Sequence, residues 1–481
     1  MTTELPDWLA HRAHVRPGHP ALITAAESMS YQALDQRASA VAGALAARGV
    51  VSGDRVAVMG ESTTTFVEAV HALPRCGAVL VPLNPRLTTE ELAWQIGRVR
   101  PRLVIVSTGS EEAARAAAGT TPVVTGEELR SDMEAVPSRR RDPNDLHSVL
   151  FTSGTTGRPR GVMLTYGNFW ASAVGSAFNL GVSPDDRWLA AMPLFHVGGL
   201  SILLRSVIYG TTVVLHNGFD EYAVNRAIRE EGVTLFSAVA TMLQRMLDAD
   251  DAPYPPSLRG ALIGGGPVPG PLLERAIDRG IPVLQTYGLT EATSQVCTLE
   301  PSDAVNHLGS AGKPLLGTEV RVDAPASQPG EILVSGPTIT PGYFEEPEVT
   351  AERIRDGWLH TGDIGRMDAD GFLYVLDRRN DLIVSGGENI SPVEVEKVLM
   401  EHPSIDEAAV IGLPDPHWGH RVVAAIVAAP TLDDAAIEAW LRPRLASYKR
   451  PREFRRVEAL PRTASGKVQR HVLRERWAAP E

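Results

Sequence analysis

Apolar residues along the first 320 positions recur at two spacings, one typical of helices and one typical of buried strands. The segment 31–50 places Leu34, Ala38, Val41 and Leu45 on one helical face. Strand-sized runs rich in β-branched residues alternate with such helices, among them RVAVMG, GAVLVPLN, RLVIVS, SVLFT, TVVLH, TLFSAV and IPVLQTYG. This alternation predicts an α/β fold, with a large N-terminal domain of largely parallel sheets flanked by helices.

The pattern changes beyond about residue 320. Strands separated by tight glycine turns, such as GEILVSG and EAAVIGLPD, occur together with two predicted helices, VEVEKVLMEH and AAIEAWLRPRLASY. A smaller α+β domain is therefore expected. The charged run DRRND at 377–381 is the predicted boundary, because charged residues at a strand exit stay solvated when two domains move about them. We expect one domain over residues 1–376 and a mobile domain over residues 377–481.

Composition narrows the class of protein. A chain of 481 residues is more than one core usually serves, and a net charge of -12 provides no basic surface for nucleic acid. Cys76 and Cys297 stand alone, without the spacing of a zinc site or a disulfide framework, which fits a reducing cytoplasm. The N-terminus lacks a signal-peptide pattern, and the apolar stretch 199–216 contains Arg205 and Gly210, so neither export nor a membrane span is expected. A homo-oligomer is compatible with the sequence.

The segment FTSGTTGRPRG at 151–161 is the clearest candidate for a ligand-binding loop. Its three glycines and four hydroxyl-bearing residues let backbone N–H groups and hydroxyls converge on an anion. Arg158 and Arg160 add positive charge for phosphate oxygens, and Pro159 stiffens the turn. The spacing matches neither a Walker A loop nor a dinucleotide fingerprint. On these residues alone, a flexible linker is the alternative.

The same loop resembles the most recognisable motif of the adenylate-forming superfamily, which includes acyl-CoA synthetases, peptide-synthetase adenylation domains and luciferases. YGLTE at 287–291, HTGD at 360–363, LDRRNDLIVSGGENISP at 376–392 and PRTASGK at 461–467 follow in that family's order, so the resemblance covers essentially the whole chain. The family loop usually ends Pro-Lys-Gly. Here Arg160 replaces the lysine, which retains the charge but favours bidentate phosphate binding.

The resemblance implies ATP-dependent activation of a small-molecule carboxylic acid, with Mg²⁺ as cofactor and coenzyme A as co-substrate. It implies that Lys467 inserts between carboxylate and α-phosphate as the catalytic lysine, and that Thr290 and Glu291 contact phosphate and Mg²⁺, for which a hydroxyl and a hard carboxylate oxygen are suited. Asp377 is implied as the hinge. The nucleotide site implied in this way comprises Thr152, Ser153, Gly154, Thr155, Thr156, Gly157, Arg160, Gly265, Gly266, Pro267, Tyr287, Gly288, Asp363 and Arg378. Without the surrounding motifs, the alternative for Glu291 is an acid that caps a helix, and the alternative for Lys467 is an exposed lysine.

The segments between the motifs decide which acid is bound. In these segments, and above all in DRWLAAMPLFHVGGLS and SVIYGTTVVLH, the sequence resembles the o-succinylbenzoate–CoA ligases of menaquinone biosynthesis. Such a substrate keeps an ionised aromatic carboxylate in the pocket, which needs a cation or several donors. Arg205 lies about two and a half helical turns beyond His196, a spacing that could place it at the far end of the pocket as this cation. Alternatively, its side chain reaches the surface or pairs with an acidic residue. The candidate substrate residues are His196, Arg205, Gly264 and Ser294, with His196 also implied beside the acyl carboxylate.

Other functions remain as alternatives. A CoA ligase for a fatty, aryl or malonyl acid, or an enzyme that loads a carrier protein, would use the same motifs. A nucleotide-binding sensor without catalysis would be expected to have lost Lys467, Glu291 or Asp363, and all three are present. A serine hydrolase is disfavoured because the sequence has no Gly-x-Ser-x-Gly elbow.

Overall fold

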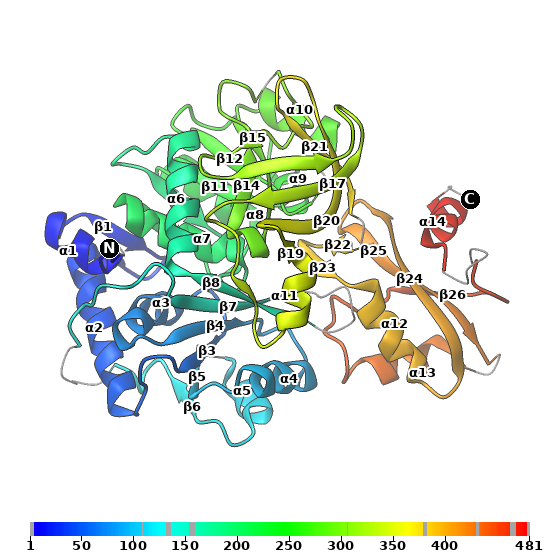
Figure 1. Cartoon of the computed structure of the whole chain (residues 1–481), viewed down its shortest axis with the longest axis horizontal. Helices are drawn as coiled ribbons and strands as arrows, with labels where there is room; N and C mark the ends of the chain where they lie inside the picture. Colours follow the sequence, from blue (N-terminus) through cyan, green and yellow to red (C-terminus); the bar gives the residue numbers. More distant parts are fainter. Residues whose placement is uncertain are drawn as a thin grey trace. The chain divides into compact units, whose positions relative to one another are not determined.

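The computed structural model describes residues 4–107, 109–130, 136–152, 159–266, 268–304, 306–378, 382–429, 432–461 and 468–478. The mixed α/β architecture predicted from the alternation of helices and strands is confirmed (Figure 1). The chain divides into two compact units. Unit 1 comprises residues 1–85, 98–151 and 161–377, and unit 2 comprises residues 86–97, 152–160 and 378–481.

The largest sheet of unit 1 has nine strands in the order β15-β14-β13-β12-β11-β9-β10-β1-β2. Its central strands, from β13 to β1 in this order, run parallel, and antiparallel pairs close both ends. The strands are β1 (Pro20–Ile23), β2 (Ser28–Ser30), β9 (Arg187–Ala190), β10 (Thr212–Leu215), β11 (Leu235–Ala238), β12 (Gly260–Ile263), β13 (Val283–Leu289), β14 (Ser294–Thr298) and β15 (Lys313–Pro314). The carboxyl ends of β9, β11, β12 and β13 therefore share one edge, where ligands of open α/β sheets usually bind.

Two further sheets complete unit 1. A seven-stranded sheet has the order β18-β8-β7-β4-β3-β5-β6, and an antiparallel sheet has the order β16-β17-β20-β19 with β21 paired to β20. The first contains β3 (Arg55–Met59), β4 (Val79–Leu83), β5 (Leu103–Val106), β6 (Val123–Thr125), β7 (Leu146–Thr152), β8 (Arg160–Thr165) and β18 (Gly342–Tyr343). The second contains β16 (Glu319–Asp323), β17 (Gly330–Ser335), β19 (Ile354–Arg355), β20 (Trp358–Met367) and β21 (Leu373–Arg378).

Helices cover both faces of the nine-stranded sheet. One continuous core joins residues of α2, α3, α6 and α7 to this sheet and to the seven-stranded one, and a second core packs α8, α9 and α10 against the opposite face. The helices of unit 1 are α1 (Trp8–Val15), α2 (Tyr31–Ala47), α3 (Thr64–Cys76), α5 (Glu111–Ala118), α6 (Tyr166–Leu180), α7 (Val197–Tyr209), α8 (Glu221–Glu230), α9 (Ala240–Ala249), α10 (Gly270–Asp278) and α11 (Pro347–Arg353). The apolar stretch 199–216 thus forms most of α7 and then β10, and it lies in the protein interior.

Unit 2 is built on an antiparallel sheet with the order β23-β22-β25-β24, to which β26 adds in parallel. Its strands are β22 (Ile383–Ser385), β23 (Glu388–Ile390), β24 (Ile405–Asp415), β25 (Gly419–Ala428) and β26 (Glu453–Arg456). Its helices are α12 (Pro392–Met400), α13 (Asp434–Leu441), α14 (Arg470–Ala478) and most of α4 (Thr89–Val99). The helix predicted over residues 435–448 is wrong in its second half: α13 ends at Leu441, because Pro443 cannot continue it.

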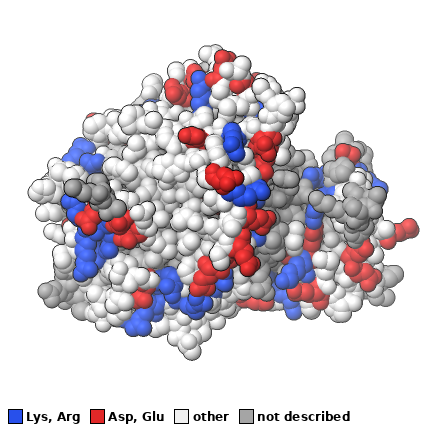
Figure 2. Space-filling view, in the orientation of Figure 1, with Lys and Arg blue, Asp and Glu red and all other residues white. Residues whose placement is uncertain are grey.

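The charge distribution on the surface (Figure 2) agrees with the net negative charge of the sequence. Acidic and basic side chains alternate over the face drawn in Figure 2 and form no continuous basic area there. Within the described ranges, no helix has both the length and the apolar character needed to cross a membrane.

Candidate active site

The turn between β13 and β14 carries the predicted motif YGLTE. Tyr287 and Gly288 lie near the end of β13, and Thr290 and Glu291 open a 3₁₀ turn, η1 (Thr290–Ala292). A Cβ atom at Gly288 would lie 1.6 Å from the carbonyl oxygen of Ser294 on the paired strand. Only a glycine permits so close an approach. The shape of this turn therefore depends on Gly288.

Two consecutive residues with left-handed backbone close the same turn. Thr293 has φ 54° and Ser294 has φ 84°, a region that non-glycine residues rarely adopt. Thr293 is fully buried and held three times: its N–H donates to the Thr290 carbonyl (3.0 Å), its hydroxyl donates to the Thr338 carbonyl (2.6 Å), and its carbonyl accepts from the Ser172 hydroxyl (2.7 Å). Strained backbone that the surroundings fix in this way is typical of ligand sites.

Glu291 is oriented by residues that no sequence motif indicated. The Tyr343 hydroxyl donates to Oε1 of Glu291 at 2.9 Å, and the Thr340 N–H donates to its carbonyl at 2.8 Å. Burial and the adjacent Glu291 carboxylate raise the pKa of Tyr343, so that the phenol remains a protonated donor. The Glu291 side chain is thus held in one position next to the strained turn.

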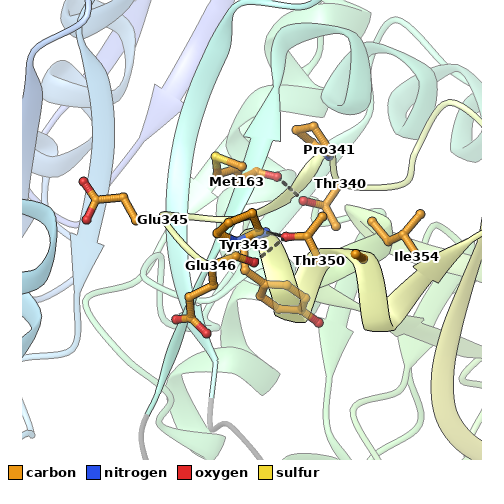
Figure 3. A pocket seen from close by; sticks show the side chains of 10 residues that line it. Met163, Thr340, Pro341, Tyr343, Glu345, Glu346, Thr350 and Ile354 are labelled. Carbon is orange, nitrogen blue, oxygen red and sulfur yellow. Dashed lines mark hydrogen bonds between the residues drawn. The ribbon is translucent and has the colours of Figure 1, made fainter.

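Tyr343 also borders an open hollow of ≈ 570 Å³ (Figure 3). In that wall the Thr340 hydroxyl donates to the Met163 carbonyl at 2.5 Å, and the Tyr343 N–H donates to the Thr350 hydroxyl at 3.0 Å. These bonds tie β18 to β8 and to α11. They fix the strand that carries Tyr343, and through it the position of Glu291.

Asp363 lies within β20, in the predicted motif HTGD. The Tyr287 hydroxyl donates to its Oδ2 at 2.7 Å, and its own N–H donates to the Thr361 hydroxyl at 3.0 Å. Asp363 is buried, and hydrogen-bond donors such as Tyr287 compensate its carboxyl group for the loss of solvation. The structure therefore brings together Tyr287 and Asp363, two residues that separate motifs predicted for the nucleotide site.

The predicted glycines 264–266 follow β12 at the carboxyl edge of the nine-stranded sheet. A Cβ atom at Gly264 would lie 2.8 Å from the Thr286 carbonyl, and Gly265 has φ +79°. Both positions therefore require glycine. The bare backbone of this segment lies beside β13, which carries Tyr287.

The helix α7 carries the two residues predicted for the acid. His196 is its N-cap residue, with its ring 4.6 Å from that of Phe195. Arg205 is buried in the same helix, which rules out the surface alternative considered for it. Its Nη2 donates to the Ser172 hydroxyl at 3.0 Å, Nε has no hydrogen-bond partner, and no carboxylate of a described residue forms an ion pair with the guanidinium. Burial lowers the pKa of Arg205.

The remaining predicted residues contribute less to this geometry. Thr152 ends β7 and Arg160 begins β8, both within unit 2 by contacts, and the backbone of Asp377 and Arg378 ends β21. The following predicted residues lie outside those that the structure describes: Ser153, Gly154, Thr155, Thr156, Gly157, Pro267 and Lys467.

Three residues of the site were missed by the sequence reasoning: Ser172, Thr340 and Tyr343. Ser172 and Thr293 are 121 positions apart, and Tyr343 and Glu291 are 52 positions apart. A serine on an amphipathic helix and a tyrosine in a short strand carry no local signal. Only the tertiary contacts give these side chains their place.

Family models match both parts of the chain. The model described as AMP-binding enzyme matches residues 9–344, and the model described as AMP-binding enzyme C-terminal domain matches residues 394–467. Among curated proteins, the 2-succinylbenzoate--CoA ligase of Bacillus cereus (strain Q1) is 43% identical over 479 residues, which cover 98% of this chain and 98% of the relative.

Solved structures of o-succinylbenzoate CoA synthetase from Bacillus subtilis are similar over the whole chain. A double mutant bound with the product analogue OSB-NCoA has a TM-score of 0.94 at 40% identity, covering 98% of both chains. The complex with the acyl-adenylate intermediate OSB-AMP has a TM-score of 0.76 at 39% identity, covering 100% of this chain and 99% of the other. The complex with ATP and magnesium ion has a TM-score of 0.76 at 40% identity, covering 98% and 99%.

Proposed function

The chain belongs to the family of AMP-binding enzymes, and from this membership we propose that it is a 2-succinylbenzoate–CoA ligase. It converts o-succinylbenzoate, ATP and coenzyme A to o-succinylbenzoyl-CoA, AMP and pyrophosphate. The identity of 43% over nearly the whole length of a curated ligase supports the acid and the thiol acceptor. The activity belongs to menaquinone biosynthesis, and we propose a cytoplasmic location, where ATP and coenzyme A are available.

The residues around the β13–β14 turn fit ATP and Mg²⁺. Asp363 offers a buried carboxylate to the ribose hydroxyls, and the glycine backbone at 264–266 offers a surface for adenine. Glu291 offers hard oxygen ligands to Mg²⁺. Among the described residues no group of three His, Cys, Asp or Glu side chains gathers around a metal position, which agrees with a Mg²⁺ ion that shares its ligands with substrate phosphates. When bound, the ion neutralises phosphate charge.

The buried Arg205 is the observation in this chain that best supports the choice of acid. A buried cation is stable only when an anion or several acceptors compensate it. Among the described residues its hydrogen-bond acceptor is Ser172, and Nε has none. The ring carboxylate of o-succinylbenzoate supplies the missing anion, and a guanidinium binds a planar carboxylate through two parallel hydrogen bonds. His196, Gly264 and Ser294 are proposed to border the rest of the acid.

Two chemical steps follow from this arrangement. The aliphatic carboxylate attacks the α-phosphorus of ATP, the bond to pyrophosphate breaks, and the acyl adenylate forms. The coenzyme A thiolate then attacks the acyl carbon, and AMP leaves. We propose Lys467 as the cation that brings carboxylate and α-phosphate together in the first step, with Thr290, Thr152 and Arg160 at the phosphates. Asp377 is the proposed hinge of a mobile domain that begins at residue 377.

Pyrophosphate release tests this function. Purified protein, ATP and Mg²⁺ are incubated with a panel of acids that includes o-succinylbenzoate, benzoate, malonate and a medium-chain fatty acid, with and without coenzyme A. The variant Lys467→Ala is the control. We expect pyrophosphate and thioester with o-succinylbenzoate only, and loss of both with the variant.

Each other outcome identifies a different alternative. If another acid gives the highest kcat/KM, the adenylation chemistry stands and the role given to Arg205 is wrong. If no acid releases pyrophosphate, the protein is a nucleotide-binding sensor, and binding of ATP without turnover will show it.

A further inference from the structure

We infer that Ser172 is a positioning residue that selects for a diacid, because its single hydroxyl links the cation of the acid pocket to the turn that carries Thr290 and Glu291. The inference rests on the proposed function, in which Arg205 binds the ring carboxylate. Ser172 belongs to no motif, and it lies at the middle of α6, where α6 and α7 run side by side (Figure 1).

The direction of the two hydrogen bonds at Ser172 is determined by chemistry. A guanidinium has only donors, so the Ser172 oxygen accepts from Nη2 of Arg205 at 3.0 Å. The one hydroxyl proton of Ser172 is then directed to the Thr293 carbonyl at 2.7 Å. Both bonds are buried, and the positive charge on one side polarises the hydroxyl and strengthens the second bond. The chain therefore runs in one direction, from Arg205 through Ser172 to Thr293.

The first consequence concerns the orientation of Arg205. The bond to Ser172 uses one of five guanidinium N–H groups and fixes the plane of the fork. Nε, which has no hydrogen-bond partner, is left for a ligand. A carboxylate in this plane is bound by two donors, whereas an acid without the ring carboxylate gains nothing from the same arrangement. Ser172 thus affects the binding of the diacid and not that of the monoacid.

The second consequence concerns the turn. Thr293 has left-handed backbone, and Ser172 is one of three partners that hold it. The Thr293 N–H in turn donates to Thr290, the residue proposed at the phosphates. When a carboxylate binds Arg205, the charge that polarises Ser172 is partly neutralised, and the bond to the turn changes with it. The acid pocket and the phosphate turn are coupled through this one hydroxyl.

A matched pair of variants tests the inference. Ser172→Ala removes the linking hydroxyl, and Ser176→Ala removes a hydroxyl one helical turn further along, at the same burial, while the bonds of Arg205, Ser172 and Thr293 stay intact. For each variant, kcat/KM is measured with o-succinylbenzoate. The inhibition constant is measured for 4-oxo-4-phenylbutanoate, the same keto acid without the ring carboxylate.

For Ser172→Ala we expect kcat/KM with o-succinylbenzoate to fall by about tenfold to a hundredfold, the range for a lost charge-assisted hydrogen bond, mostly through KM. The inhibition constant of the monoacid should change less than about twofold. Ser176→Ala should change neither value. In an Arg205→Gln background, Ser172→Ala should cause no further loss of the preference for the diacid over the monoacid, because the cation that Ser172 orients is already absent.

Equal losses for diacid and monoacid would show a merely structural role and overturn the inference, as would an unchanged kcat/KM in Ser172→Ala. If Ser172→Ala does not fold, Ser172→Cys replaces it, since a thiol of similar shape is a weak donor and acceptor. Failure of the proposed function is recognised separately, because the wild-type protein would then release no pyrophosphate with o-succinylbenzoate.

Discussion

Two buried arginines in unit 1 have opposite surroundings. Arg75 on α3 is 1% exposed and pairs with Asp7 at 3.1 Å and Asp35 at 2.5 Å, with a further bond to the Ser39 hydroxyl. Arg205 on α7 is 4% exposed and bonds to a neutral hydroxyl, with no carboxylate of the described residues paired to it. Both side chains are almost fully removed from water, yet among the described residues only Arg75 is paired with anions.

The difference separates a structural cation from the cation that we propose binds the substrate. Burying a charge costs several kcal/mol, by general estimates, unless a counter-charge and hydrogen bonds compensate it. At Arg75 the fold supplies both. At Arg205 the described residues supply one hydroxyl, and we propose that the ligand supplies the missing compensation. Burial alone does not distinguish the two residues, whereas the presence of their partners does.

The largest effect is expected at the structural cation. Arg75→Met leaves the Asp7 and Asp35 carboxylates without their counter-charge, and the free energy of unfolding should fall by about 3 kcal/mol. Chemical denaturation measures this. The kcat/KM of the folded variant with o-succinylbenzoate should stay within about twofold of wild type, since no substrate contact is proposed there.

Arg245→Met is the control for this variant. Arg245 forms a surface pair with Glu221, and such pairs contribute about 0 to 1 kcal/mol. If Arg75→Met is no more destabilising than Arg245→Met, the comparison between paired and unpaired buried cations fails.

Arg205, the proposed substrate-binding cation, should show the reverse pattern. Arg205→Gln removes the donor fork for the ring carboxylate, so kcat/KM with o-succinylbenzoate should fall by about a hundredfold, whereas the free energy of unfolding should stay the same or rise. Steady-state kinetics and chemical denaturation on one preparation measure both. Arg205→Lys keeps the charge without the fork and should give an intermediate loss. A drop in stability without a change in KM would assign Arg205 to the structural class.

Buried histidines extend the comparison, because a histidine, unlike an arginine, can lose its proton and become neutral when it is buried. His147 is packed against the rings of Trp8, Tyr166 and Phe169, and burial lowers the pKa of His147 to about 3. The unfolded chain titrates near 6.5. Between these values the unfolded state binds more protons, so the free energy of unfolding falls as the pH falls, by up to about 1.4 kcal/mol per pH unit for each such histidine.

His147→Phe should remove about 1 kcal/mol of the stability loss between pH 7 and pH 5.5, measured by urea denaturation at both values. His71, whose pKa burial also lowers to about 3, is the neighbouring group with the same sign. His71→Leu should likewise remove about 1 kcal/mol of the loss in the free energy of unfolding between pH 7 and pH 5.5. A pH dependence unchanged in both variants would show that these histidines are already charged in the folded protein.

How much the sequence predicts depends on whether a feature is local. The segment 199–216 contains its own helix and strand pattern, and the structure has α7 and β10 there. Pro443 is a local signal too, and attention to it would have placed the end of α13 correctly. Gly288 stands in a motif, although the physical need for it appears only when the Ser294 carbonyl lies 1.6 Å from the place of a Cβ atom.

The sequence does not predict the hydrogen-bond and ion-pair partners of the site residues. Nothing in the residues around Ser172 indicates a bond to Thr293, and nothing around Tyr343 indicates a bond to Glu291. For Arg205 the sequence left three possibilities. Burial excludes the surface, no acid among the described residues is paired with it, and substrate binding stays the prediction. The roles of Lys467 and of the glycine-rich loop at 153–157 lie outside the described residues and stay predictions.

The smallest effect on catalysis is expected on the anionic side of the site. Tyr287→Phe removes the hydroxyl that donates to Asp363 at 2.7 Å and leaves the ring in the core. A neutral donor orients this carboxylate without cancelling its charge. The variant should therefore loosen the proposed ribose contact of Asp363 and raise KM for ATP by about tenfold, with KM for the acid unchanged. Initial rates at varied ATP and saturating acid measure this. If KM for the acid rises equally, Tyr287 supports the whole turn, and the separation of an acid side from a nucleotide side of the site is wrong.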